Sequence, residues 1–478
     1  MLDRLALEAQ TGRHHMSRRS SKNRARSGNP ISRRKFLGSA AAGAALFTIV
    51  PRHVLGGVGY TPPSEKLNIA CIGIGGKGRS DVQGVAGENI VALCDVHEGH
   101  AAGTFKRYPD AKKYNDFRKM LDENPEIDAV TVSTPDHTHA VAAMRAIKMG
   151  KHAYCQKPLT HTVFEARALA EAAREHKVAT QMGNQGHASE ETRRICEFIW
   201  NGAIGPVREV HVWTDRPSRG LFNEYWPQGV GRPEETPAVP DDLKWDLWLG
   251  PAPQRPYHPA YAPFRWRGWW DFGTGALGDI GCHALDPVFR ALRLGAPLTV
   301  QATSTRVNKE TYPLASMVRY RFGARDSSSA SVEMPPVTVT WYDGGLKPPR
   351  PAELDPGIEM GSGGTLYVGD KGMMLGLMIL PESRRLEFEP PPRTIPRSIG
   401  HYKEWIEACK GEEAAGSNFD ISGPLTEAVL LGNVALRTEV REPLTKQVLR
   451  WDSEKMQFTN LPDANRFIHR EYRDGWTL

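Results

Sequence analysis

Short apolar runs recur between residues 66 and 186, and the segments that separate them have helical spacing. The apolar runs lie at residues 67–73, 90–94, 129–133, 152–155 and 178–181. Such runs are typical of strands that are buried on both faces of a parallel sheet. The intervening segments predict helices at residues 101–107, 117–122, 139–149 and 163–176. Strands that alternate with helices predict a doubly wound α/β domain of the Rossmann type.

The pattern changes after residue 186. Residues 207–213 alternate between apolar and polar positions, as a half-exposed strand does, and further strands are predicted at 299–307, 316–322, 329–334 and 338–341. Helices are predicted at 190–200, 277–292, 399–408 and 425–437. Residues 214–270 and the segment after 341 are rich in Pro, Trp or Gly and predict loops. This half of the chain therefore predicts an α+β domain with a large, open, mainly antiparallel sheet.

These changes of pattern divide the chain into five parts. We expect a leader at residues 1–57, a linker at 58–65 and a dinucleotide-binding Rossmann domain at 66–186. An α+β domain for substrate binding and oligomer formation follows at 187–450, and a C-terminal tail at 451–478.

Basic residues are concentrated in the leader. Residues 1–64 hold 11 of the 61 Lys and Arg residues but only 2 of the 55 Asp and Glu residues. Ser32-Arg33-Arg34-Lys35-Phe36-Leu37 precedes an uncharged stretch, residues 38–50, which is shorter than the ~20 residues that cross a bilayer. A basic segment before a short apolar one predicts a signal peptide, and the arginine pair resembles a twin-arginine signal. We expect an exported, periplasmic protein that meets the twin-arginine export machinery; the alternative is a disordered basic tail.

The composition of the remaining chain excludes other classes. Acidic and basic residues nearly balance without a Lys/Arg stripe, so no nucleic-acid partner is expected. No other apolar segment approaches membrane-spanning length, which predicts no stable membrane anchor. The six cysteines form no C-x-x-C pair and lie mostly in apolar runs, which predicts buried free thiols, and no metal site is expected.

A glycine motif follows the first predicted strand. It reads Gly73-Ile74-Gly75-Gly76-Lys77-Gly78 and fits G-x-G-x-x-G. Such glycines allow a tight turn, a close approach of the backbone to a pyrophosphate, and close packing of helix on strand. Asp95 ends the second predicted strand, where a carboxylate accepts hydrogen bonds from ribose hydroxyls and repels a 2′-phosphate. The motif predicts bound NAD rather than NADP.

Three further motifs, taken in order with the glycine motif, resemble the Gfo/Idh/MocA oxidoreductase family. They are Thr134-Pro135-Asp136-His137-Thr138-His139, Gln156-Lys157-Pro158 and Asp279-Ile280-Gly281-Cys282-His283. The resemblance covers residues 66–437. It implies that Thr134, Pro135, His137, His139, Gln156 and Lys157 lie beside the dinucleotide. It also implies a homo-oligomer, because the open sheet of this family commonly forms subunit interfaces.

The chemistry of alcohol oxidation assigns roles to three of these residues. When a hydride leaves a carbinol carbon, the hydroxyl must lose its proton, and a cation stabilises the alkoxide that develops. His283 is the candidate base, and the resemblance gives Lys157 the alkoxide-stabilising role. Asp279 lies four residues before His283, on the same helical face, and could orient the imidazole or bind a substrate hydroxyl. A solvated Asp–His pair is the alternative.

One position departs from the family pattern. Gln156 stands where the family usually has Glu. The change removes a negative charge beside Lys157, and we expect it to lower the pKa of that lysine.

Aromatic residues crowd the segment before the predicted catalytic helix. Aromatic faces stack on sugar rings, although they more often fill cores. Candidate substrate contacts are Trp213, Arg216, Trp269 and Trp270.

The leading hypothesis is an NAD-dependent dehydrogenase that acts on a sugar, polyol or glycoside and holds its cofactor tightly, because free NAD is scarce outside the cytoplasm. The resemblance also allows a redox-neutral, NAD-dependent glycoside hydrolase, with Tyr225, His258 or Tyr261 as an extra acid/base group. The third alternative is a non-catalytic sugar-binding protein.

Overall fold

The computed structural model describes residues 62–478 except 219–223, 329 and 438–447. The Arg33-Arg34 pair and the leader lie outside the described residues. Residues Pro63–Leu478 form one compact unit. None of the helices in the described ranges combines the length and the apolar character needed to cross a membrane. All six cysteines are free thiols, and only Cys409 is partly exposed.

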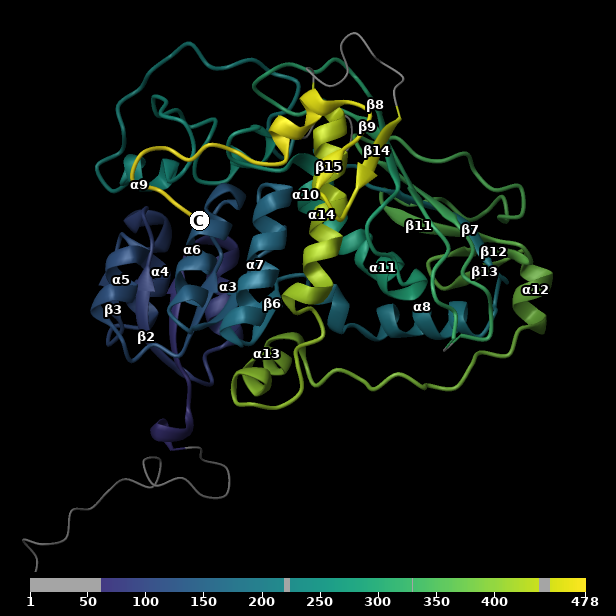
Figure 1. The fold of residues 1–478 in the computed structure, drawn as a ribbon, viewed down its shortest axis with the longest axis horizontal. Helices are drawn as coiled ribbons and strands as arrows, with labels where there is room; N and C mark the ends of the chain where they lie inside the picture. The colour runs from purple at the N-terminus through teal and green to yellow at the C-terminus, as the bar shows by residue number, and fades with distance from the viewer. Residues whose placement is uncertain (1–61, 219–223, 329, 438–447) are drawn as a thin grey trace, which may run out of the picture. The chain divides into compact units, whose positions relative to one another are not determined.

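The first half of the compact unit is a Rossmann domain, as predicted (Figure 1). Its six strands are all parallel and lie in the order β3-β2-β1-β4-β5-β6. The strands are β1 Asn68–Ile72, β2 Asn89–Cys94, β3 Lys112–Tyr114, β4 Ala129–Val132, β5 His152–Cys155 and β6 Thr180–Met182. The helices are α3 Gly76–Gly84, α4 Glu98–Arg107, α5 Phe117–Glu123, α6 Asp136–Lys148 and α7 Val163–His176. Strand β3 was not predicted, because it is a short edge strand with two exposed lysines and no apolar run.

The second half is built on a nine-stranded sheet in the order β13-β12-β11-β7-β10-β9-β8-β14-β15. The strands are β7 Val207–Trp213, β8 Thr299–Ser304, β9 Ser316–Phe322, β10 Val337–Tyr342, β11 Gly364–Gly369, β12 Gly372–Leu375, β13 Met378–Leu380, β14 Leu449–Asp452 and β15 Gln457–Phe458. Within this described sheet the β7–β10 pair is parallel and the other pairs are antiparallel. The predicted α/β plus open-sheet architecture is confirmed.

Four details of the second half differ from the sequence prediction. Strands β14 and β15 form where no strand was predicted. Residues 330–334 form no strand. Strands β11 to β13 form where loops were predicted, because a tight turn at Asp370 and Lys371 folds a short hairpin. The helix predicted at 277–292 is two helices, α10 Gly275–Ala284 and α11 Asp286–Leu292. Pro287 lies in the first turn of α11, where its missing N–H costs nothing, and it separates the two helices.

Further helices complete the fold. The main ones are α8 Glu190–Trp200, α13 His401–Cys409 and α14 Phe419–Leu436, and shorter ones are η1 Pro63–Glu65, η2 Gln185–Ala188, α9 Trp245–Leu249, η3 Arg265–Gly268, α12 Glu382–Glu387 and η4 Pro462–Phe467. Helix α14 packs against α7, α10 and β8. Trp405 and Ile406 of α13 pack into one hydrophobic cluster with Ile69 and Leu93 of the Rossmann sheet. The chain therefore returns to its first domain before β14 and β15 complete the second sheet.

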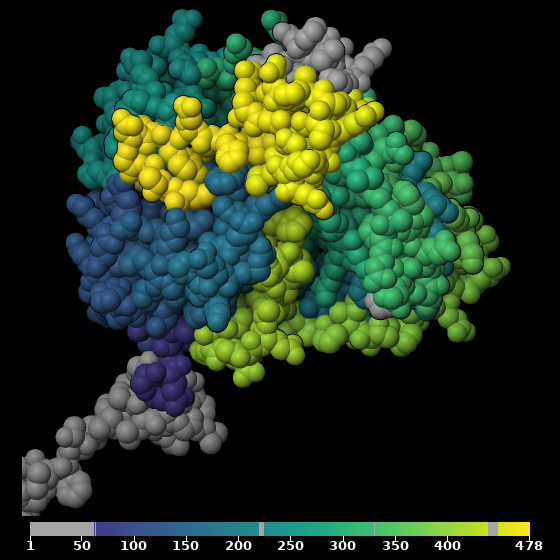
Figure 2. Space-filling view, in the orientation of Figure 1, coloured from purple at the N-terminus to yellow at the C-terminus, as the bar shows by residue number. Residues whose placement is uncertain are grey.

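The last residues of the chain also pack on the Rossmann domain. The Tyr472 hydroxyl donates to Glu165 Oε1 at 2.7 Å, and Arg470 Nε donates to the same atom at 3.0 Å. Glu165 is buried on α7. Figure 2 shows these C-terminal residues, in yellow, lying against the blue surface of the Rossmann domain. Helix α13 and the C-terminal segment therefore both pack on the Rossmann domain.

Candidate active site

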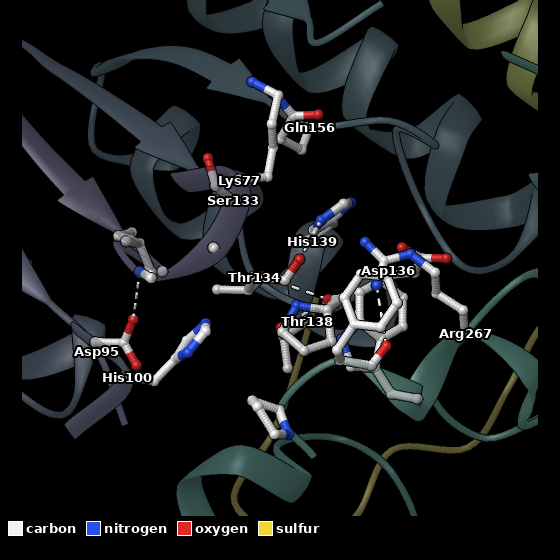
Figure 3. Close-up of a pocket in the computed structure, with 18 of the residues that line it drawn as sticks. Lys77, Asp95, His100, Ser133, Thr134, Asp136, Thr138, His139, Gln156 and Arg267 are labelled. Carbon is white, nitrogen blue, oxygen red and sulfur yellow. Dashed lines mark hydrogen bonds between the residues drawn. The ribbon is translucent and has the colours of Figure 1, made fainter. Parts of the chain in front are cut away.

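A cavity of about 530 Å³ opens at the carboxyl ends of the parallel strands and is closed by the second half of the chain. The Rossmann side contributes the glycine loop, Asp95, Ser133 to Asp136, Gln156 and Lys157. The second half contributes Arg216, Tyr225, Phe264, Trp266, Arg267, Asp279 and His283. This is the edge where open α/β sheets bind ligands, and the volume is within the range of ligand sites. In Figure 3, Asp95 and His100 lie on one side of the pocket and Arg267 on the other, with His139 between.

The glycine loop forms a cradle in which backbone approaches closely. Gly73 has φ +74°, and a Cβ there would lie 2.7 Å from the Ser133 carbonyl oxygen. A Cβ on Gly78 would lie 1.8 Å from the Gly73 carbonyl oxygen, so only glycine lets α3 pack on β1. Helix α3 begins at Gly76, and Gly75, Gly76 and Lys77 line the cavity. The N-terminus of this helix presents amide groups to an anion, as a pyrophosphate site requires.

Asp95 lies beside the glycine loop and accepts hydrogen bonds from it. Its Oδ2 accepts hydrogen bonds from the backbone N–H groups of Ile74 at 2.9 Å and Gly75 at 3.2 Å. Its Oδ1 accepts from the backbone N–H of His97 at 2.9 Å. The carboxylate lines the cavity beside the loop, where a 2′-phosphate would meet its negative charge. His100 also lines this side, and sequence reasoning missed it because no motif marks it.

A buried ion-pair cluster joins the two halves on the opposite side of the cavity. The Lys157 ammonium donates to Asp279 Oδ1 at 2.7 Å and to the Asp279 carbonyl oxygen at 2.6 Å. Arg267 Nε donates to the same carboxylate oxygen at 3.0 Å. Burial opposes ionisation, but Lys157 and Arg267 hold the pKa of the Asp279 carboxyl well below its usual value. Asp279 therefore pairs with two cations and does not orient the imidazole of His283, which corrects one of its two predicted roles.

His283 lines the same cavity. Burial, followed by the positive charge of Lys157, lowers the pKa of His283 to about 3. The ring is therefore neutral near pH 7 and has a nitrogen lone pair to accept a proton. Within the described part of the chain, no residue is hydrogen-bonded to this ring, so it is available to a ligand.

Asp136 is a cavity residue that sequence reasoning did not single out. It begins α6 and accepts a hydrogen bond from the Thr274 hydroxyl at 2.5 Å, across the junction of the two halves. Burial raises the pKa of Asp136 to about 7, against the hydrogen bond from Thr274 and the charges of Arg267 and Lys157. Its position directly before His137 in the motif was the available signal.

The two motif histidines on α6 have structural contacts. His137 is fully buried and is not part of the cavity lining, so its predicted place beside the cofactor is wrong. Its ring nitrogens lie 3.2 Å and 2.9 Å from the carbonyl oxygens of Phe272 and Trp248. His139 does line the cavity, with Thr134 and Pro135, and its ring nitrogens lie 2.8 Å from the carbonyl oxygens of Thr134 and Pro158. These contacts hold neighbouring strand ends together.

The predicted substrate contacts are mostly core residues. Trp213, Trp269 and Trp270 are each at most 2% exposed and do not line the cavity. Their indole N–H groups donate to the carbonyl oxygens of Gly361, Ala260 and Asn308, respectively. Arg216 does line the cavity, and its guanidinium lies 4.7 Å from the Tyr225 ring centroid. The Phe, Tyr and Trp residues of the lining are Phe117, Tyr225, Trp248, Phe264 and Trp266. The density of aromatic residues in the sequence identified this segment, but it did not show which rings face the cavity.

Gln156 contacts a different charge from the one expected. It lines the cavity, and its Nε2 donates to Asp81 Oδ2 at 2.9 Å. The counter-charge of Lys157 is Asp279, which comes from the second half. Adjacency in sequence alone therefore does not support the predicted effect of Gln156 on the pKa of Lys157.

Comparison with protein families decides the assignment. The profile described as "Oxidoreductase family, NAD-binding Rossmann fold" matches residues 67–184, and "Oxidoreductase family, C-terminal alpha/beta domain" matches residues 200–324. The chain belongs to the Gfo/Idh/MocA family. Its Rossmann domain is the NAD-binding domain of that family, and the cradle of Gly73 to Gly78 with Asp95 fits the dinucleotide.

Several known proteins are similar to parts of the chain. Levoglucosan dehydrogenase of Pseudarthrobacter phenanthrenivorans is 25% identical over 194 residues, 41% of this chain and 40% of that protein. Inositol 2-dehydrogenase of Salmonella typhimurium is 27% identical over 30% of this chain and 45% of that protein. Glycosyl hydrolase family 109 protein 1 of Shewanella sp. (strain MR-4) is 30% identical over 30% of this chain and 34% of that protein. The chain spans less than half the length of each of these relatives.

Solved structures share the fold. The WlbA dehydrogenase from Bordetella pertussis, in complex with NADH and UDP-GlcNAcA, has a TM-score of 0.53 and 16% identity, covering 81% of this chain and 100% of that one. GenD2 from gentamicin A biosynthesis, in complex with NAD, has a TM-score of 0.52 and 16% identity, covering 85% and 100%. At this identity the likeness establishes the fold alone.

Proposed function

We propose that this protein is an NAD-dependent oxidoreductase that acts on a CH–OH group of a sugar, polyol or glycoside and holds its cofactor tightly. The observation that carries the proposal is the Lys157 ammonium, fixed by Asp279 in the cavity that also contains the glycine cradle and His283. The relatives that act on levoglucosan and inositol support a polyhydroxylated substrate.

Each residue then has a chemical task. Bound NAD would supply the hydride acceptor, with Gly73 to Gly78 and Asp95 holding it. His283, which lines the cavity, accepts the proton of the substrate hydroxyl. Lys157 stabilises the negative charge that develops on the same oxygen, and Asp279 holds the lysine in position. Arg267 and the aromatic lining orient the rest of the sugar.

A redox-neutral glycoside hydrolase is the second candidate. The 30% identical family 109 relative favours it, and so does one lining residue. Elimination of a glycosidic substituent needs an additional acid/base group. Of Tyr225, His258 and Tyr261, which the sequence left open, Tyr225 lines the cavity. We assign it that task in this alternative.

Two measurements test these proposals. Denatured protein is assayed by mass for released nicotinamide dinucleotide, and cofactor-loaded protein is titrated with a panel of sugars and glycosides. Reduced-nicotinamide absorbance that rises in proportion to added sugar supports the dehydrogenase. Aglycone release without net cofactor reduction supports the hydrolase. Neither signal, together with no NAD binding, would contradict both and favour a sugar-binding protein.

Export through the twin-arginine route remains part of the proposal. It rests on the Arg33-Arg34 pair before residues 38–50. Tight cofactor retention is consistent with it, because that route carries folded proteins. Replacing both arginines by lysine in the full chain should leave the protein in the cytoplasmic fraction; unchanged periplasmic recovery would contradict the route. The homo-oligomer stays a prediction, to be tested by sedimentation.

A further inference from the structure

A fully buried carboxylate lies directly under the glycine cradle. Asp81, on α3, is 0% exposed. It accepts hydrogen bonds from the Ser133 hydroxyl at 2.8 Å, the Gln156 amide at 2.9 Å and the Tyr402 hydroxyl at 2.6 Å, and it pairs with the Lys77 ammonium. Four donors from four segments therefore satisfy one negative charge, which is what an ionised carboxylate needs when it is removed from water.

The Gln156 side chain is oriented by this carboxylate. Its Nε2 donates to Asp81, and its Oε1 accepts from the backbone N–H of Lys157 at 3.4 Å. The amide thus connects Asp81 to the residue that carries the candidate alkoxide-stabilising ammonium. A glutamate at position 156 would put a carboxylate oxygen against Asp81 Oδ2. Two carboxylates in contact cannot both ionise without a large penalty.

We propose that Asp81 and Gln156 are a matched pair of positioning residues. In this pair, Asp81 carries the negative charge and Gln156 carries the amide that donates to it. Asp81 then positions the glycine loop through its contacts with Lys77 and Ser133. Through Gln156, it also positions the backbone directly before Lys157. The proposal deepens the proposed function, because it rests on Lys157 and the cradle acting on one ligand.

Tyr402 of helix α13 packs over Asp81 on the side of α3 away from the cavity. The Tyr402 ring lies so close to α3 that a Cβ on Gly84 would be 2.6 Å from a ring carbon. The same ring stacks on Tyr154 of β5, with centroids 5.5 Å apart. The carboxylate is therefore enclosed on the side away from the cavity, and no water replaces a lost donor without repacking.

A double-mutant cycle tests the pair. The variants are Asp81→Asn, Gln156→Glu and the combination, with Gln83→Glu as a control that adds the same charge on the exposed side of α3. NAD affinity is measured by calorimetry, and thermal unfolding is measured on NAD-free protein. We expect each single variant to weaken NAD binding at least tenfold and to unfold at lower temperature. The double variant should return within about threefold of the wild-type affinity, and the control should match the wild type.

Two results would overturn the proposal. One is a double variant whose affinity loss equals the product of the single losses. The other is measured on Gln156→Met, which removes the amide without adding charge. This variant can be compared with Gln156→Glu even if Asp81→Asn fails to fold. The pair requires Gln156→Glu to bind NAD more weakly than Gln156→Met, and equal or tighter binding contradicts it. Both readouts need no substrate, so they remain interpretable if no sugar is oxidised. Where turnover is measurable, kcat should recover with the affinity in the double variant.

Discussion

The Lys157 ammonium and the Asp279 carboxylate, 122 positions apart in sequence, meet at 2.7 Å with both side chains less than 15% exposed. The contact joins the Gln-Lys-Pro motif in the Rossmann domain to helix α10 in the second half. It places the lysine where a substrate oxygen between the two halves would meet it.

Asp279→Asn should disable the lysine without removing it. The carboxamide keeps the shape but leaves two cations, Lys157 and Arg267, without their shared counter-charge. Loss of one partner of a buried pair costs about 3–5 kcal/mol. We expect a lower melting temperature and a fall in kcat of about 10²-fold or more, in the range of lost acid–base positioning. Asp463→Asn, at an exposed position, is the matched control. Wild-type kcat in Asp279→Asn would contradict the ion-pair role.

Lys157→Ala and His283→Ala separate the two catalytic tasks. Each should lower kcat by about 10²–10⁴-fold, because each removes one group that acts on the reacting hydroxyl. His283→Ala should keep its bound NAD, since this residue is outside the cradle. Steady-state kinetics and cofactor content by mass measure both effects. Near-normal turnover in both variants would eliminate the proposed site.

Asp136 should make the folded state less stable as pH rises. Burial raises the folded-state pKa of Asp136 to about 7 from an ordinary value of 3.8. Between these values the unfolded chain has lost the proton while the folded chain still holds it, so the free energy of unfolding falls with rising pH. The slope is at most about 1.4 kcal/mol per pH unit and ends above the folded pKa. Asp136→Asn should lack this slope between pH 4 and 7, whereas Asp110→Asn, which is exposed, should keep it. Denaturant titrations at several pH values measure it, and identical slopes in all three proteins would refute the assignment.

Truncation of Phe264 and of Trp269 should affect different properties, KM in the first case and stability in the second. Phe264 lines the cavity and is 37% exposed, so Phe264→Ala should mainly raise KM for the sugar, by the factor of about 2–10 that one aromatic contact is worth. Trp269 is 1% exposed in the core and outside the lining, so Trp269→Ala should cost about 3–5 kcal/mol of stability. KM and thermal unfolding, measured on both variants, distinguish a substrate wall from a core. A larger KM effect from Trp269 would reverse this interpretation.

Local patterns in the sequence predicted most strands of the Rossmann domain. Apolar runs located β1, β2, β4, β5 and β6, because a strand that is buried on both faces has apolar residues at successive positions. They missed β3, whose lysines face solvent at the sheet edge, and β11 to β13, which follow from hairpin pairing rather than composition. They also missed β14 and β15. The Gly-x-Gly-x-x-Gly spacing located the cradle for the same reason, since its backbone requirements are local.

The contacts of the motif residues were decided only by the tertiary structure. Sequence placed His137 beside the cofactor, Asp279 beside His283 and Gln156 beside the charge of Lys157. In the fold, His137 is instead buried between two carbonyl oxygens. Asp279 accepts hydrogen bonds from Lys157 and Arg267, and Gln156 donates to Asp81. A motif specifies which groups are available, but hydrogen-bond partners depend on distances of about 3 Å that are set when separate segments pack together.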